Sequence, residues 1–223
     1  MFDVQIQQDS YTGGAEGTSR PIRVNPRGEQ IVVPNIEALV HDGCVFGFNL
    51  GTGDTEFPFV EVAYDDDQPQ IGIAIPAGTT VLPLSFEIAI EAQVGTLNQF
   101  VLACGQCAAL GSGTSTAVTP VNILTRGGRA TTCTVFNTVT VDITADPASE
   151  TGYYEFWRHV DPYAHSDNDS GYGSTVGWHR AKEGYGPIVV GPGFIVAYIY
   201  ATTTDAEGFL RMTWAEIPST NMT

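Results

Sequence analysis

The strongest constraint on the fold is an alternation of apolar and polar residues with a period of two. It is clearest over residues 81–94, where one set of alternate positions is apolar: Leu82, Leu84, Phe86, Ile88 and Ile90. The other set carries Ser85, Glu87 and Glu91. Because successive side chains of a strand point to opposite faces, this pattern predicts a strand with one buried and one solvated face. Such strands are typical of antiparallel sheets, since parallel strands are usually covered on both faces.

Other segments carry the same alternation or are apolar throughout. Apolar residues alternate in TVFNTVTVDIT (134–144) and again at Leu210, Met212 and Trp214. Residues 194–200 (FIVAYIY) are apolar on both faces, which predicts a central strand covered on each side. Weaker patterns predict further strands at 30–33, 37–40, 45–50, 57–64, 70–75, 100–104, 117–124 and 153–159.

Turn residues separate these strands and indicate the fold class. Glycine stands next to or near Asp or Pro in the sequence at Asp42-Gly43, at 76–78 (PAG) and at 191–193 (GPG). Such combinations are typical of tight turns between strands. No stretch repeats apolar residues at the spacing of an amphipathic helix over three turns. Many short strands with frequent turns predict an all-β fold, and we expect an antiparallel β-sandwich.

The first residues differ in composition from the rest. Residues 1–28 are polar and glycine-rich, and we expect them to form an extended N-terminal arm, with residues 29–223 forming one β-sandwich domain. Three arginines lie in the arm within SRPIRVNPRGE: Arg20, Arg23 and Arg27. Two interpretations stay open, a loop with scattered charges and a docking arm for an acidic partner surface.

Charge and hydropathy narrow the range of partners. The chain has 9 Lys and Arg against 25 Asp and Glu, a formal net charge of -16. A phosphate backbone would be repelled by such a surface, so we expect no binding to nucleic acid. No apolar run approaches the roughly 18 residues of a membrane span, and the start of the chain does not resemble a signal peptide, so we expect no membrane association.

The four cysteines predict neither a disulfide framework nor a metal site. Cys104 and Cys107 have the spacing of a redox dithiol or of half a zinc site, while Cys44 and Cys133 lie far away in sequence. A redox motif would need a strand-to-helix context, and a zinc site would need a second ligand pair at short spacing. We therefore expect free buried thiols, no metal and no cofactor.

Aromatic and acidic residues gather in and beside a long segment that is rich in Gly, Tyr and Asp. Residues 161–187 are expected to form a long loop, and the expected contact residues are Trp157, His159, Asp167, Asp169, Tyr172 and Trp178. Oxygen ligands on alternate residues at Asp167 and Asp169 resemble part of a calcium loop, but Trp178 stands where an EF-hand needs Glu, so a looser calcium site is the alternative that stays open. Sugar binding and protein contact both suit exposed aromatic rings, and we favour an exposed contact loop.

No motif for catalysis is present. The patterns GxSxG, HExxH, GxxxxGK[ST] and GxGxxG are all missing from the sequence. Glu87 and Glu91 would lie roughly 13 Å apart along a strand, beyond either glycosidase geometry. The run Asp65-Asp66-Asp67 indicates a solvated turn. We therefore expect a protein that is not an enzyme.

Two strand-and-turn segments resemble structural proteins of tailed phages and environmental viruses. The first is IPAGTTVLPLSFEIAIE (75–91), with Pro76, Gly78, Thr79 and Thr80 as matching residues. The second is YIYATTTDAEGFLRMTWAEI (198–217), where the matches are Tyr198, Tyr200, Ala201, Thr202, Thr203, Trp214 and Glu216. FWRHVDPYA (156–164) is similar to an intervening segment of those proteins. Residues 1–60 lie outside the resemblance.

The resemblance implies a virion component with a jelly-roll fold that forms a homotrimer. Virion proteins of the decoration, or cement, type bind the major capsid protein on the outer capsid surface and brace the shell. In that arrangement the N-terminal arm would dock on the shell, and Tyr198, Tyr200 and Trp214 would lie at the oligomer interface. The alternatives are another virion part (head fibre, tail component or major shell protein) and a trimeric carbohydrate-binding module.

Overall fold

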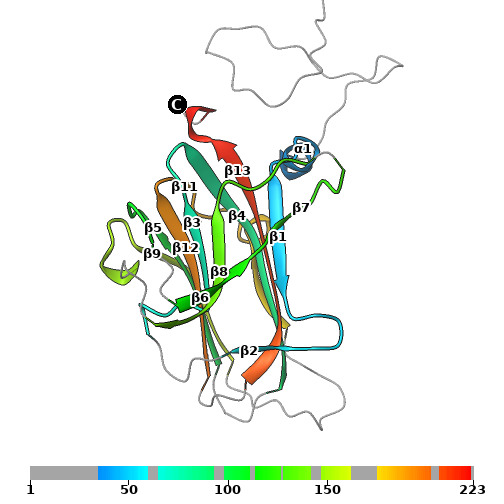
Figure 1. The fold of residues 1–223 in the computed structure, drawn as a ribbon, viewed down its shortest axis with the longest axis vertical. Helices are drawn as coiled ribbons and strands as arrows, with labels where there is room; N and C mark the ends of the chain where they lie inside the picture. The colour runs from blue at the N-terminus through cyan, green and yellow to red at the C-terminus, as the bar shows by residue number, and fades with distance from the viewer. Residues whose placement is uncertain are drawn as a thin grey trace, which may run out of the picture.

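The computed structural model describes residues 35–59, 65–92, 98–110, 114–126, 128–141, 147–161, 175–201 and 206–221. The described chain forms two antiparallel β-sheets that face each other, with short helices at the periphery (Figure 1). The N-terminal arm, with Arg20, Arg23 and Arg27, lies outside the described residues. None of the described helices has the length and apolarity that a membrane crossing requires.

One sheet has seven strands, and its middle is formed by two long strands. The order is β10 (Thr175–His179), β4 (Thr79–Ala92), β13 (Ala206–Pro218), β1 (Val45–Leu50) and β7 (Val121–Asn122). Two short strands lie off this path: β11 (Val189–Val190) pairs with β4, and β2 (Phe57–Phe59) pairs with β13. All of these pairs are antiparallel.

The second sheet has six strands. The order is β6 (Thr114–Val118), β8 (Thr134–Val141), β3 (Ile71–Ile75), β12 (Gly193–Ala201), β5 (Asn98–Gly105) and β9 (Tyr154–Asp161). These pairs are antiparallel as well. The expected antiparallel β architecture is therefore confirmed, and the two sheets form a sandwich.

The core lies between the sheets and draws on both. Ile195, Ala197 and Ile199 of β12 pack into the main cluster with side chains of the opposite sheet. The alternate residues Phe194 and Val196, together with the rest of a second cluster, pack on the other face of the same strand. The prediction of a central strand covered on both faces is thus confirmed for β12, because two separate apolar layers cover it.

The segment 114–141 joins the two sheets at one edge. Its strand β8 pairs with β3 of one sheet, while its strand β7 pairs with β1 of the other (Figure 1). The turn between them is held by Asn122, whose Nδ2 donates to the backbone oxygens of Gly43 (2.8 Å) and Arg129 (3.0 Å). The segment therefore closes this edge of the sandwich with its own chain.

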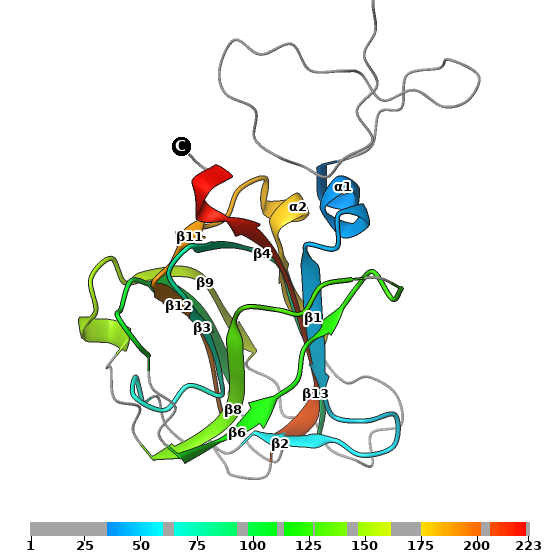
Figure 2. The ribbon, with the colours of Figure 1, turned by 45° about the horizontal axis from the view of Figure 1, so that its top comes forward.

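Short helices lie at four places in the described chain. Residues 37–40 were expected to be a strand, but α1 (Asn35–His41) is a helix that buries Leu39 against a cluster containing Val45 and Ala215. The prediction was wrong because four residues cannot separate a strand pattern from one helical turn. The other helices are α2 (Arg180–Glu183), η1 (Pro147–Ser149) and η2 (Ser219–Asn221). Figure 2 shows that α1 and η2 lie at the same end of the sandwich.

Strand β4 does not keep one face throughout its length. Its pairing with β13 shifts between Thr213 and Trp214, so that Trp214 lies opposite Pro83 and Thr213 opposite Ser85. Leu84 is the extra residue of this bulge. Because of it, the set of alternate residues that faces the main core before Leu84 is not the set that faces it afterwards. Phe86 therefore packs in the main core, whereas Leu82 packs in the cluster beneath α1.

Candidate functional site

Most of the aromatic residues expected in a contact loop lie on two edge strands, β9 of the six-stranded sheet and β10 of the seven-stranded sheet. The pairing of β9 with β5 shifts so that Leu102 lies opposite Trp157 and Ala103 opposite Glu155, which leaves Phe156 as a bulged residue. Both Phe156 and Trp157 consequently pack against the main core. Trp157 contacts Phe86 of the opposite sheet, with ring centroids 5.9 Å apart.

Trp178 lies inside the core, which corrects the expectation that it forms part of an exposed loop. It belongs to β10, which pairs with β4 so that Trp178 lies opposite Phe86. Its side chain is only 2% exposed, and its ring meets Phe156 edge to face at 5.1 Å. Residues 175–179 form a strand and residues 180–183 a helix, so neither belongs to the long loop expected over 161–187.

His159 is half-buried, and its ring lies in an aromatic stack. The imidazole is stacked on Trp157, with centroids 6.1 Å apart and an interplanar angle of 10°, and on Phe100 at 6.2 Å. Asp167, Asp169 and Tyr172 lie outside the described residues. The described chain thus brings Trp157 and His159 together and gives both a packing role.

A small aromatic pocket lies where β9 and β10 meet the α2 turn. It has a volume of about 150 Å³, and its walls include Tyr154, Phe156, Trp178, Glu183 and Tyr185. Tyr154 and Tyr185 are 54% and 74% exposed. The sequence analysis did not single out Tyr154, Glu183 or Tyr185, because only the fold brings two tyrosines 31 positions apart to one pocket (185 − 154).

The remaining wall of this pocket, Gly186–Pro187, is held by the arginine that begins α2. The guanidinium of Arg180 donates to the backbone oxygens of Pro187 (2.9 Å) and Gly186 (3.0 Å). Its burial lowers the pKa of Arg180 from the ordinary arginine value. A Cβ on Gly186 would lie 2.8 Å from the Trp178 ring, so the backbone passes directly over the indole. The pocket wall is therefore preformed.

The three aromatic residues expected at an oligomer interface have different environments. Trp214 has no exposed surface and packs between Phe46 and Phe48, with ring centroids 6.1 and 6.0 Å away. Tyr198 is 2% exposed, and its hydroxyl donates to the backbone oxygen of Asp66 (2.8 Å). Both side chains are already covered by their own chain, which corrects the expectation that they offer surface to another subunit.

Tyr200 is partly exposed and takes part in a polar cluster on the outer face of the six-stranded sheet. Its hydroxyl donates to Oε1 of Gln99 (3.0 Å) and accepts from the guanidinium of Arg158 (3.0 Å). Arg158 also forms a two-point ion pair with Glu155 at 2.7 Å, and this hydrogen bonding raises the pKa of Arg158 above its ordinary value. Such partly exposed pairs fix side-chain geometry more than they add stability.

A buried carboxylate, noted in the sequence only as one of the residues shared with virion proteins, ties β13 to the chain before β8. Glu216 has no exposed surface. Its carboxylate accepts hydrogen bonds from the Thr131 hydroxyl, from the backbone N–H (2.9 Å) and hydroxyl (3.0 Å) of Thr132, and from the Trp214 indole (3.0 Å). Burial alone would raise the pKa of Glu216, but these hydrogen bonds outweigh it and lower the pKa. The sequence signal for this site was a charged residue, Glu216, at the same alternate positions as the apolar Leu210, Met212 and Trp214.

The cysteines are free thiols, as expected, and three of them are buried: Cys104, Cys107 and Cys133. Burial raises the pKa of the Cys104 thiol to about 12. Burial, with the charge of Glu216 as a second cause, also raises the pKa of Cys133. A nucleophilic or metal-binding cysteine needs its thiolate, so these environments favour an unreactive structural role.

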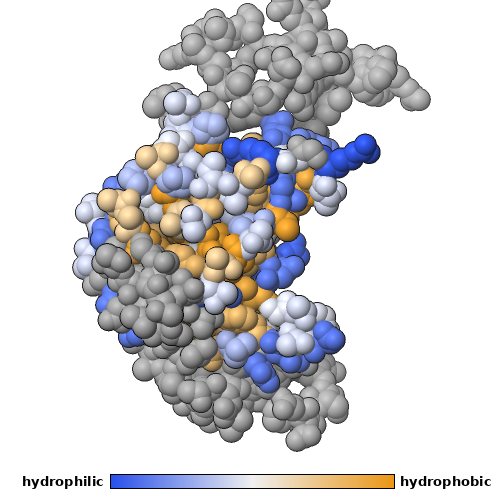
Figure 3. Space-filling model, viewed as in Figure 1, coloured by the Kyte–Doolittle hydropathy of each residue, from blue (hydrophilic) through white to orange (hydrophobic). Residues whose placement is uncertain are grey.

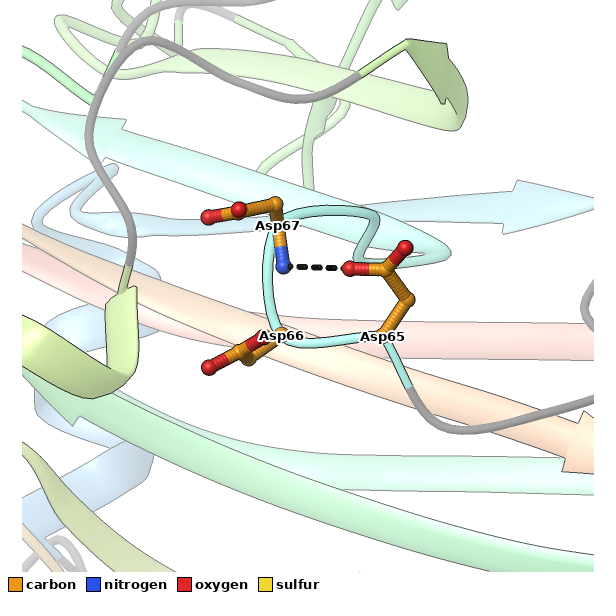
Figure 4. A group of neighbouring side chains, drawn as sticks. All are labelled: Asp65, Asp66 and Asp67. Carbon is orange, nitrogen blue, oxygen red and sulfur yellow. Dashed lines mark hydrogen bonds between the residues drawn. The ribbon is translucent and has the colours of Figure 1, made fainter.

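The run Asp65-Asp66-Asp67 forms a turn with its carboxylates close together (Figure 4). One carboxylate oxygen from each residue lies within 4.8 Å of the others. Oδ1 of Asp65 accepts from the backbone N–H of Asp67 (3.0 Å), and its Oδ2 accepts from the Gln68 side chain (3.1 Å). These bonds are those of an Asx turn, which accounts for the arrangement of Asp65.

The outer face of the seven-stranded sheet carries a wider, more open groove. It has a volume of about 420 Å³ and lies over β1, β13 and β4, with Asn49, Arg211 and Glu87 among its lining residues. Figure 3 shows the molecule hollowed at its right-hand side, between the segment that carries β7 and the loop after β1. Its lining mixes apolar side chains with three polar residues that lie opposite one another across the strands, Asn49, Arg211 and Glu87.

Comparisons with known proteins do not assign this chain to a family. No protein-family model matches the sequence, and no curated protein matches it. Among solved structures, the crystal structure of the infectious bursal disease virus VP2 subviral particle is 12% identical with a TM-score of 0.14. That match covers 80% of this chain and 40% of the VP2 chain, so the chain spans less than half of its length. It is a weak structural neighbour and carries no argument here.

Proposed function

We propose that the protein is a virion structural protein, a decoration protein with a jelly-roll fold that binds the outer surface of a phage capsid. In this proposal it braces the shell by contact with the major capsid protein, as a homotrimer and without catalysis. The resemblance of residues 75–91 and 198–217 to virion proteins is one support. The order of the strands is the other, and it carries the proposal.

The strand pairs are nested in the way that a rolled-up pair of Greek keys requires. Eight strands taken in chain order are β1, β3, β4, β5, β9, β10, β12 and β13. The first pairs with the eighth (β1 with β13) and the second with the seventh (β3 with β12). The third pairs with the sixth (β4 with β10) and the fourth with the fifth (β5 with β9). Such nesting in two sheets supports a jelly roll, an architecture of viral capsid and lectin domains.

The distribution of arginines supports an arm that docks on an acidic surface. Of the arginines in the described chain, three are engaged internally: Arg129 lies over the Phe46 ring at 5.6 Å, Arg158 pairs with Glu155, and Arg180 donates to backbone oxygens. The body also carries the whole net charge of -16, because the three arginines of residues 1–28 are balanced by three acidic residues there. A body of this charge would be repelled by an acidic shell, so attraction has to come from a locally basic segment.

The arm can be tested by removing it. The described residues begin at Asn35, so deletion of residues 1–28 leaves every described strand in place. Mixed with particles of the cognate phage that lack this protein, the deleted chain should fail to co-sediment, whereas the full chain should bind. Substitution of Arg20, Arg23 and Arg27 by Ser should weaken binding, and the matched change of the exposed Arg126 and Arg211 should not. Equal occupancy with and without the arm would refute the docking role.

Self-association can be tested separately by light scattering. A homotrimer would have three times the chain mass of 23.8 kDa. Because Tyr198 and Trp214 are covered within one chain, Tyr200 is the one of the three expected interface residues with exposed surface to offer. A stable monomer at micromolar concentration that still binds particles would remove the trimer from the proposal and leave the decoration role standing.

A further inference from the structure

We propose that the aromatic pocket between β9, β10 and α2 binds one pyranose ring of a neutral saccharide. The pocket is defined by Tyr154, Phe156, Trp178, Glu183, Tyr185 and the backbone of Gly186–Pro187. This inference goes beyond capsid decoration and does not depend on it, since the pocket lies within one chain.

The size of the pocket limits the ligand to a single ring. Its volume of about 150 Å³ is well below the roughly 300–1,000 Å³ of pockets that enclose drug-sized molecules. It corresponds to about five water molecules at about 30 Å³ each. A longer ligand would therefore place one unit in the pocket and leave the others in solvent.

The lining calls for a ligand with both an apolar face and hydroxyl groups. Tyr154 and Tyr185 present large exposed ring surfaces, and the edge-to-face pair of Phe156 and Trp178 forms an apolar wall. Phenol hydroxyls and the Glu183 carboxylate supply hydrogen-bonding groups beside these rings. A pyranose has this combination, because one face carries C–H groups while hydroxyls project from its rim.

The local charges argue against a charged ligand. An anion would meet the carboxylate of Glu183, and the guanidinium of Arg180 already donates to Gly186 and Pro187. A cation would gain from the rings but would meet Arg180 in the wall and Lys182 on the same short helix. Since neither sign is favoured, the pocket suits a neutral molecule.

The pocket also needs little rearrangement to bind. Arg180 fixes the Gly186–Pro187 wall through two hydrogen bonds, and α2 ends at Gly184 in a left-handed conformation with φ of 74°. The other walls belong to strand β9 and to the buried Trp178. A site built on strands and a clamped turn keeps its shape in the free protein, which reduces the entropic cost of binding.

The test is saturation-transfer NMR on the full chain with methyl glycosides of glucose, galactose, mannose and N-acetylglucosamine as probes. We expect at least one of them to bind with a millimolar dissociation constant, through protons on one face of the ring. Tyr185→Ala should weaken that binding by about tenfold, because it removes a stacking surface. Ile188→Ala is the matched control, since Ile188 is 49% exposed beside the pocket but does not line it.

The polar contact has its own pair of variants. Glu183→Gln should weaken binding several-fold, whereas Lys182→Gln on the same helix should leave it unchanged. Binding of none of the four probes at concentrations up to the solubility limit would overturn the proposal. So would binding that survives Tyr185→Ala, or tighter binding of the anionic sialic acid or of a proline-rich peptide. Because no particle is used, these outcomes are distinct from those that test capsid docking.

Discussion

The indole Nε1 of Trp214 donates a 3.0 Å hydrogen bond to Oε1 of Glu216, two residues further along β13. Residues two apart on a strand face the same side, so the carboxylate projects toward the core together with the indole. It is ionised there because hydroxyl and N–H donors from Thr131 and Thr132 complete its hydrogen bonding. The resulting cluster fixes the last strand to the chain that leads into β8.

Replacing Glu216 by Gln should lower the free energy of unfolding by about 2–3 kcal/mol at neutral pH, since hydrogen bonds to a charged group are lost. The pKa of Glu216 is lowered in the folded state, so its contribution is present above the ordinary glutamate pKa of about 4.3 and is lost as the pH falls through the folded pKa. The difference between the two proteins should therefore shrink below about pH 4.3, as measured by urea unfolding at several pH values.

The matched control for this prediction is Glu207→Gln, on the same strand but only partly buried. It should change the free energy of unfolding by less than about 0.5 kcal/mol. If Glu216→Gln were as mild as Glu207→Gln, the hydrogen-bonded cluster would not be a stabilising feature.

Gly72→Ala should destabilise the fold by about 1–3 kcal/mol through overpacking. A Cβ at Gly72 would lie 2.2 Å from the ring of Phe136, which is 2% exposed and has no room to move. Gly53→Ala is the control, because a Cβ there meets nothing within 4 Å and its backbone is not left-handed. Thermal unfolding of the two variants should differ clearly, and equal melting temperatures would contradict the packing of β3 against β8.

Trp178→Ala should cost about 3–5 kcal/mol of stability, the range for deleting a buried indole. Tyr185→Ala should cost less than about 0.5 kcal/mol, since Tyr185 is 74% exposed. Denaturant unfolding measures both. A small effect at Trp178 would mean that β10 does not hold the indole in the core, and a large one at Tyr185 would make that variant unsuitable as a ligand-binding probe.

Cys104 and Cys133 should resist thiol reagents in the folded protein at neutral pH. Burial raises the pKa of Cys104 to about 12 and also raises that of Cys133, so the reactive thiolate is scarce as well as inaccessible. Labelling followed by mass spectrometry should find these two sites protected in buffer, with all four cysteines modified in denaturant. Rapid labelling of Cys104 in the native state would contradict the placement of β5.

Strands with a long alternating or wholly apolar pattern were predictable. The expected strand at 45–50 coincides with β1, and the one at 194–200 differs from β12 by a residue at each end. The short strand β10 was not predicted, because Gly177 and the polar residues around it hide the alternation of Val176 and Trp178. Its inward pattern becomes evident only when β4 supplies a partner.

The candidate site was less predictable than the fold. Tyr154 and Tyr185 meet because β9 and the α2 turn flank the same end of β10, which is a tertiary relationship with no local signature. The expectation for Trp214 failed for a different reason. Aromatic residues suit both cores and interfaces, and only pairing with β1 reveals that Phe46 and Phe48 cover the indole.

The central position of β13 has a consequence for how the protein is made. This strand lies between β1 and β4, so that Val45 pairs with Ala215 across most of the chain. A ribosome releases β1 and β4 long before it adds residues 206–218, and until then their facing edges have no neighbour. Folding of the seven-stranded sheet must therefore follow synthesis of its middle strand, and until then the nascent chain exposes strand edges that can pair with other chains.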